Sequence, residues 1–88
     1  MKIQFKASFG EDLRGVHDRA LLARIKGFIE AVEVAQSLFD IPNLRKMQGG
    51  TNYYLVRIGE FRIELKIEGD TVTFIRCLNR KDIYKYFP

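Results

Sequence analysis

The chain has one cysteine, one histidine and no long apolar run among its 88 residues, and each scarcity excludes a class of protein. Cys77 alone cannot form an internal disulfide or build a metal site, and its place in an apolar strand pattern indicates a buried, inert thiol. His17 stands at an expected helix junction without an Asp or Ser partner at a triad spacing, so we assign it a structural or solvated role. The sequence therefore indicates neither a metal nor any other cofactor.

The apolar residues are divided into short segments. No stretch approaches the roughly 18 consecutive apolar residues that a membrane span needs, and the charge-interrupted start lacks the apolar segment of a secretory signal. We therefore expect a cytoplasmic protein that does not associate with membranes. A chain of 88 residues buries about 60 to 65% of its unfolded surface in one modest core, so residues 1–88 are expected to form a single domain.

Positive charge is concentrated in the second half of the chain. Residues 1–40 contain six lysines and arginines and six aspartates and glutamates, whereas residues 41–88 contain nine and five. The net charge of +4 therefore arises entirely after residue 40. A basic surface on one set of elements is typical of a protein with a polyanionic or an acidic protein partner.

Two amphipathic helices are expected in the first half. Ser8 and Glu11 match a capping box, which predicts that the first helix begins at Phe9. Asp18 is a suitable cap for a second helix over residues 19–39, where apolar side chains recur at steps of three and four residues. The apolar positions of this second helix are Leu21, Ile25, Phe28, Val32, Ala35 and Phe39.

Four strands are expected around these helices. Residues 2–7 alternate apolar and polar side chains, and residues 53–58, 61–68 and 71–78 read as strands after a polar, glycine-bearing loop at 44–52. The two-residue turns that begin at Gly59 and Gly69 predict antiparallel hairpins. The expected order is β-α-α-β-β-β, and the fold class is α+β, with both helices on one face of a mostly antiparallel sheet.

The middle strand of the three places charged side chains on the side away from the helices. Alternation puts four of them on an exposed face: Arg62, Glu64, Lys66 and Glu68. Arg62 and Lys66 would lie about 13 Å apart on this face. Arg57 lies across the turn from Arg62, and the segment after the last strand returns Arg80, Lys81 and Tyr84. Two interpretations stay open: the cations converge on a phosphate ligand, or each pairs with a carboxylate on a solvated face.

Two runs of residues carry a family resemblance. The run YLVRIGEFRI at residues 54–63 and the run NRKDIY at residues 79–84 resemble the signature of the RelE/ParE superfamily of toxins from toxin–antitoxin systems. The start of the first helix, the helical pair and the run NLRKM at residues 43–47 are similar to the same pattern. The resemblance covers essentially the whole chain.

The resemblance implies a ribosome-dependent, metal-free endoribonuclease that cleaves mRNA in the ribosomal A site. In this reaction the ribose 2′-oxygen attacks the adjacent phosphate, and fixed cations stabilise the developing charge. By motif, Arg62 matches the family's transition-state arginine, Arg80 the arginine near the leaving group, and Tyr84 the tyrosine that stacks on a base. The residues expected to bind RNA phosphates are Arg57, Lys46, Lys66 and Lys81. The implied protein partner is an antitoxin encoded beside the toxin.

The sequence departs from the family pattern at the positions that transfer protons. Asn79 stands where some members have histidine, while Tyr53 and Leu55 stand where one branch has lysines. The substitutes available as the base are Lys46, Lys66 and Glu64. Two other functions stay open: ParE-like inhibition of DNA gyrase without RNA cleavage, and a non-toxic interaction domain of the same fold.

Overall fold

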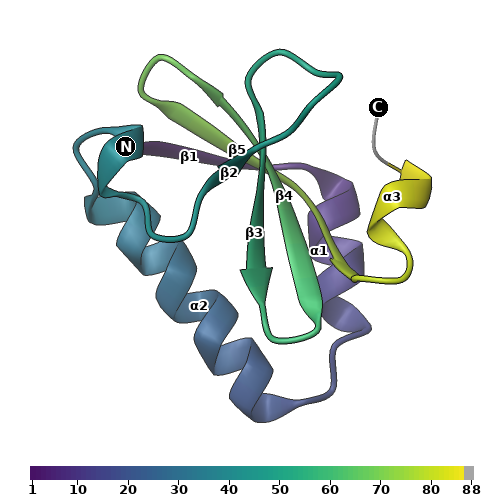
Figure 1. The fold of residues 1–88 in the computed structure, drawn as a ribbon. Helices are drawn as coiled ribbons and strands as arrows, with labels where there is room; N and C mark the ends of the chain where they lie inside the picture. The colour runs from purple at the N-terminus through teal and green to yellow at the C-terminus, as the bar shows by residue number, and fades with distance from the viewer. Residues whose placement is uncertain (87–88) are drawn as a thin grey trace.

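The expected α+β class is confirmed by the computed structural model, which describes residues 1–86 apart from the side chains of Tyr84 and Tyr86. Figure 1 shows the course of the chain. The elements are β1 (Lys2–Phe5), α1 (Ala7–Arg14), α2 (Arg19–Val34), the 3₁₀ helix η1 (Leu38–Asp40), β2 (Arg45–Lys46), β3 (Tyr53–Ile58), β4 (Phe61–Glu68), β5 (Thr71–Asn79) and α3 (Ile83–Tyr86).

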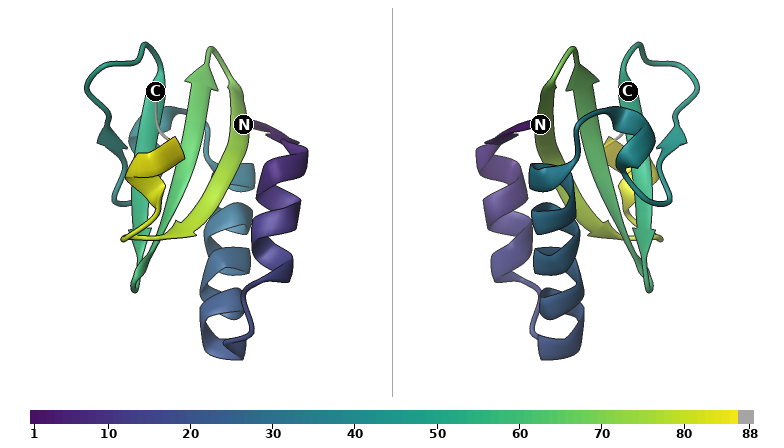
Figure 2. Two further views of the ribbon diagram at one scale, coloured as in Figure 1. Left: turned by 90° about the vertical axis from the view of Figure 1, so that its right-hand side faces the viewer. Right: turned by 90° about the vertical axis from the view of Figure 1, so that its left-hand side faces the viewer.

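The strands form one five-stranded sheet in the order β1-β5-β4-β3-β2. β1 runs parallel to β5, and the other neighbouring pairs are antiparallel. α1 and α2 cover one face of the sheet, while the short α3 lies against the opposite face (Figure 2). We call this opposite face the open face. Across β3 and β4 it consists of the paired positions Arg57 and Arg62, Leu55 and Glu64, and Tyr53 and Lys66.

The core lies between the two long helices and the sheet. Phe9 on α1 and Phe28 on α2 meet Phe74 of β5 at ring-centroid distances of 5.3 and 6.2 Å. Ile63 and Leu65, the central apolar residues of β4, are completely buried in the same cluster. The apolar side of β4 therefore receives the helices, as its alternation predicts.

Both predicted hairpin turns form. Gly59 and Gly69 have φ angles of +57° and +59°, a region that glycine enters without the steric cost of a Cβ. β3 and β4 have the predicted bounds, and β5 continues one residue further than expected, to Asn79. The hairpins therefore fix the register of the three central strands.

The capping box predicted at Ser8 and Glu11 is wrong. α1 begins at Ala7, with Lys6 at the N-cap position and no side-chain cap. The Ser8 hydroxyl instead donates a hydrogen bond to the Ile75 carbonyl of β5 at 2.6 Å. The hydroxyl therefore joins the helix to the sheet rather than capping its own helix.

The second helix is shorter than predicted. The Asp18 carboxylate caps it as expected, accepting hydrogen bonds from two amides of the first turn at 2.9 and 3.1 Å. The helix ends at Val34 rather than at residue 39, because Asp40 accepts a hydrogen bond from the Gln36 amide and favours a bend there. Phe39 consequently leaves the apolar face and is 88% exposed. Neither α2 nor any other helix within residues 1–86 is long and apolar enough to cross a membrane.

The loop expected at 44–52 contains the short strand β2. Arg45 pairs with Leu55 and Lys46 pairs with Tyr54. Paired residues point to the same face of a sheet, so Arg45 belongs to the open face. Lys46 belongs to the helix-covered face, because the Tyr54 side chain packs against the core. A strand of two residues is too short to show a period, so the sequence does not predict β2.

Candidate functional site

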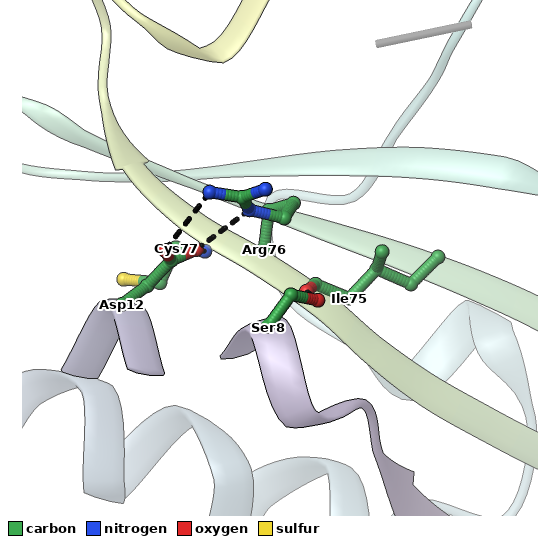
Figure 3. Close-up of polar contacts among 5 residues, drawn as sticks. All are labelled: Ser8, Asp12, Ile75, Arg76 and Cys77. Carbon is green, nitrogen blue, oxygen red and sulfur yellow. Dashed lines mark hydrogen bonds and ion pairs between the residues drawn. The ribbon is translucent and has the colours of Figure 1, made fainter. Parts of the chain in front are cut away.

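The second half of β5 has no strand on one side. β1 pairs with only the first four residues of β5, and α1 then packs along the edge that remains. Ser8 and Asp12 lie one turn apart on α1 and both bond to this edge (Figure 3). The Ser8 hydroxyl donates to the Ile75 carbonyl, and the Asp12 carboxylate accepts from the Cys77 amide at 2.9 Å. Two helix side chains thus satisfy backbone groups that a missing strand would otherwise pair.

Asp12 also holds the side chain of Arg76. Its two oxygens accept hydrogen bonds from Nε and Nη2 of the guanidinium at 2.9 and 3.0 Å, and both side chains are mostly buried (Figure 3). Such a bidentate pair fixes orientation as well as position. The strand register places Arg76 opposite Glu64. A carboxylate on α1 therefore reaches past the edge of β5 and orients a guanidinium on the open face.

A β-bulge at Ile75 makes this arrangement possible. Glu64 pairs with Arg76 and Leu65 pairs with Phe74, which leaves Ile75 without a partner on β4. In a regular strand, residues two positions apart point to the same face. The inserted residue instead lets Phe74 enter the core while Arg76 joins the open face.

Glu64 lies at the centre of the open face and is buried, not exposed as alternation predicts. It is 2% exposed and stands between the buried Leu55 of β3 and Arg76 of β5. Burial disfavours the charged form and raises the pKa of Glu64 to about 7, although the Arg76 charge acts in the opposite direction.

A cavity of about 570 Å³ opens beside Glu64. Its lining is mostly polar and includes Lys6, Tyr53, Lys66, Thr73 and Arg76. Within it, the Lys66 ammonium lies 3.5 Å from a Glu68 carboxylate oxygen and 5.7 Å from the centre of the Tyr53 ring. Lys66 is therefore on the open face as predicted, and it has the carboxylate partner of the solvated-face interpretation.

Arg62 is buried, although the sequence predicts an exposed side chain. It is 7% exposed, and its Nη1 donates to the carbonyls of Gly59 and Phe61 at 3.1 and 3.0 Å. The guanidinium thus folds over the β3–β4 turn and is bonded there to neutral carbonyls. Both bonds come from one nitrogen, and a guanidinium has five N–H donors in total.

Arg57 and Arg80 flank the same turn. Arg57 is the register partner of Arg62 and is exposed. The Arg80 amide donates to the Glu60 carbonyl at 2.8 Å, and its side chain pairs with the Glu60 carboxylate at 2.9 Å, with both side chains exposed. The three arginines therefore gather at the turn, and one of them already has a carboxylate partner.

Three further predicted residues lie away from this centre. Lys46 is on the helix-covered face and not on the open face, because β2 pairs it with Tyr54. Lys81 is exposed in the turn after β5, where its amide donates to the Asn79 side chain. The backbone of Tyr84 lies in α3, but its side chain is outside the described part of the chain.

Three residues of the site escape prediction from the sequence: Asp12, Arg45 and Arg76. Arg45 would be identified only if β2 and its register were known. Arg76 and Phe74 are two positions apart, so alternation alone would place Arg76 on the helix-covered face with Phe74. Asp12 gives a weak signal, since it follows Ser8 by four residues and both side chains therefore share one face of α1.

The lone cysteine and histidine behave as predicted. Burial, and secondarily the Asp12 carboxylate, raise the pKa of the Cys77 thiol to about 12, so the thiol stays protonated and unreactive. His17 is exposed between α1 and α2. Among the residues with described side chains, no group of three or more His, Cys, Asp or Glu is placed to hold a metal ion.

Comparison with known proteins identifies similar toxins. No family model matches the chain. The sequence is 42% identical over 89 residues to Toxin RelE3 of Methanocaldococcus jannaschii, covering 100% of both chains. In the solved RelB-RelE antitoxin-toxin complex from Methanococcus jannaschii, one chain matches with a TM-score of 0.83 and 39% identity over 97% of this chain and 99% of that one. The YoeB dimer from Staphylococcus aureus has a TM-score of 0.70 and 21% identity over 88% and 93% of the two chains, which shows a shared fold.

Replacing Asp12 by alanine is expected to lower the free energy of unfolding by about 3 kcal/mol, because a mostly buried guanidinium and the Cys77 amide lose their acceptor. The matched control is Glu11→Ala, which removes an exposed carboxylate from the same helix and should change stability by less than about 0.5 kcal/mol. Urea unfolding of both variants measures the difference. Equal stabilities would contradict the role assigned to the edge contacts.

Glu64 should make the folded state less stable as the pH rises. The pKa of its carboxyl is raised from 4.5 to about 7 on folding, so the folded chain binds this proton more tightly and stability is lost between these pH values. Glu64→Gln removes the loss, and this variant should exceed the wild type by about 2 to 3 kcal/mol above pH 7 while matching it near pH 4. Urea unfolding across this pH range tests the prediction. Glu30→Gln, at an exposed position on α2, should follow the wild type throughout.

Proposed function

The chain belongs to the RelE family of toxins, and we propose that it is the toxin of a type II toxin–antitoxin system, a ribosome-dependent endoribonuclease that cleaves mRNA in the A site. The charge pattern of the open face is the observation that supports this most strongly. The buried carboxylate of Glu64 on β4 shares this face with cations on its own strand and on three others: Arg62 and Lys66 on β4, Arg45 on β2, Arg57 on β3 and Arg76 on β5. Cations spread along one face suit a polyanion with repeated phosphates.

The arginines at the β3–β4 turn suit the scissile phosphate. A planar guanidinium binds two phosphate oxygens at once and stays charged throughout the accessible pH range. We assign Arg62 to the charge that develops on the phosphate, since its partial burial removes competing water and strengthens this interaction. Arg57, exposed beside it, positions the same or the adjacent phosphate.

Arg80 is assigned to the leaving group, in keeping with its motif position. Its ion pair with Glu60 is exposed at both ends, and such pairs contribute only about 0 to 1 kcal/mol. An RNA phosphate can therefore displace Glu60 at little cost. Lys66 and Lys81 bind flanking phosphates, and Arg45 takes the place that the sequence assigned to Lys46, because it is on the correct face. Tyr84 is assigned to base stacking by its motif position alone.

A cognate antitoxin is the proposed protein partner. The similar toxin of Methanococcus jannaschii was solved in an antitoxin-toxin complex with RelB. The basic second half of the present chain suits an acidic partner segment, because complementary charge speeds and orients association. A protein that cleaves the mRNA of its own cell requires such an inhibitor.

Primer-extension mapping of a defined mRNA on programmed ribosomes should reveal cuts in the A-site codon. Arg62→Ala is expected to reduce their rate about 10²- to 10³-fold, because it removes a fixed cation from the transition state. The matched control is Lys26→Ala, which removes the same charge from an exposed position on α2 and should leave the rate unchanged. Thermal unfolding of each variant confirms that it is folded.

Absence of cuts with the folded wild-type protein would contradict the proposal. If that protein still arrested growth, a DNA gyrase supercoiling assay would test the ParE-like alternative. Equal losses in Arg62→Ala and Lys26→Ala would show that net charge, rather than the open face, determines activity.

A further inference from the structure

We propose that Glu64 accepts the proton of the attacking ribose 2′-hydroxyl, and that Arg76, held by Asp12, sets the charge beside it. This proposal rests on the RNA cleavage proposed above. The sequence offers no base at the positions where one branch of the family has lysines, since Tyr53 and Leu55 stand there. The open face supplies a proton acceptor on the next strand instead.

The position of Glu64 suits a base. It follows Arg62 by two residues on the same face of β4, which is about 7 Å along the strand. An RNA strand that Arg62 binds along this face would therefore run past Glu64. Glu64 also lines the cavity of about 570 Å³. An ionised carboxylate at a cavity wall accepts hydrogen bonds, so a ligand hydroxyl that enters the cavity can transfer its proton there.

The other two candidate bases are less suitable. Lys46 lies on the helix-covered face, away from the arginines of the turn. Lys66 is on the open face, but its ammonium pairs with Glu68 and lies near the Tyr53 ring. Both contacts already engage the ammonium of Lys66. Glu64 is therefore the candidate whose surroundings favour proton uptake.

Burial gives Glu64 a proton affinity that matches the task. The pKa of Glu64 is raised to about 7, and a base works best when its pKa lies near the operating pH. The apolar residue paired with Glu64 is Leu55 on β3, which is itself buried. The charged groups around it are Arg45, Arg62, Lys66 and Arg76 from the sheet, and Lys6 and Glu68 from the cavity lining. Burial outweighs the opposing effect of Arg76.

Asp12 holds Arg76 beside Glu64. The Asp12 oxygens bind Nε and Nη2 of Arg76, which is the edge of the guanidinium suited to a bidentate carboxylate contact. That edge is therefore unavailable to Glu64. Arg76 lowers the pKa of Glu64 through its nearby charge.

The proposed step is balanced without oxidation or reduction. The O–H bond of the 2′-hydroxyl breaks, and its proton passes to the Glu64 carboxylate. The electron pair of the 2′-oxygen forms a bond to phosphorus, and the bond between phosphorus and the 5′-oxygen of the next nucleotide breaks. The leaving oxygen takes a proton from water. The products are a 2′,3′-cyclic phosphate and a free 5′-hydroxyl.

Single-turnover cleavage of ribosome-bound mRNA, measured from about pH 5 to about pH 9, tests the proposal. The wild-type rate should rise with pH and level off above about pH 7, where Glu64 is ionised. Glu64→Gln should lower the rate about 10²- to 10⁴-fold without weakening ribosome binding. Glu64→Asp keeps the carboxylate and should recover part of the rate. Such a recovery would show that the rate depends on the carboxylate at this position.

Arg76 provides a second, independent readout. Arg76→Gln should move the inflection to higher pH, because it removes the positive charge that lowers the pKa of Glu64. The matched control is Arg76→Lys, which keeps the charge and should hold the inflection near the wild-type value. A merely structural role of Arg76 would change the rate at all pH values without moving the inflection.

The outcomes separate the two proposals. If the wild type cleaves and Glu64→Gln cleaves equally well, the base is wrong and the nuclease stands. An inflection that is unmoved or lowered in Arg76→Gln likewise overturns the assignment of Glu64. If the folded wild type cleaves no mRNA at any pH, the nuclease is wrong and the base falls with it.

Discussion

The contact between Asp12 and the free edge of β5 is the interaction on which the rest of the molecule depends. β1 leaves the sheet after pairing with four residues of β5, so the backbone beyond that point would lack partners on one side. One carboxylate accepts three hydrogen bonds there, one from the Cys77 amide and two from Arg76. Ser8 adds a fourth contact one turn earlier. The same contacts hold α1 against the sheet, close the core over Phe9 and orient a guanidinium toward the other face.

The two faces of the sheet differ because of a single inserted residue. The bulge at Ile75 turns Phe74 into the core and Arg76 onto the open face. On the helix-covered face, apolar burial supplies most of the favourable free energy of folding. On the open face, the chain buries the carboxylate of Glu64 among cations, which opposes folding whenever the group is ionised. A group that is unfavourable for stability and central to a charged cavity is typical of a functional site.

The sequence predicts the local structure well, because local patterns determine it. Alternation of apolar and polar residues determines the bounds of β3 and β4. The positive φ of glycine determines the two turns, and the short Asp18 side chain determines the start of α2. Tertiary contacts decide the features that the sequence does not reveal. Ser8 bonds to a distant strand instead of capping α1, and the Gln36–Asp40 bend ends α2 early. A periodic pattern of apolar residues does not predict either of these hydrogen bonds.

The site is only partly predictable for the same reason. The family motif leads to Arg57, Arg62 and Arg80, which do gather at one turn. The burial of Glu64 and the contribution of Arg76 depend on the bulge and on Asp12, which is 64 residues away from Arg76 in the sequence. The face of Lys46 depends on a two-residue strand. Alternation continued through the bulge at Ile75 assigns the residues after it to the wrong face. Alternation also does not predict how deeply the Glu64 side chain is buried.

The most direct test of this account is an NMR titration of the Glu64 side-chain carboxyl in the wild-type protein. Glutamate labelled with ¹³C at the carboxyl position gives one signal per residue, and the signal that disappears in Glu64→Gln identifies the group. Burial on the open face, opposed by the charge of Arg76, predicts a midpoint near pH 7. A midpoint near 4.5, the ordinary value for glutamate, would show that the carboxylate is solvated and would contradict the site described here.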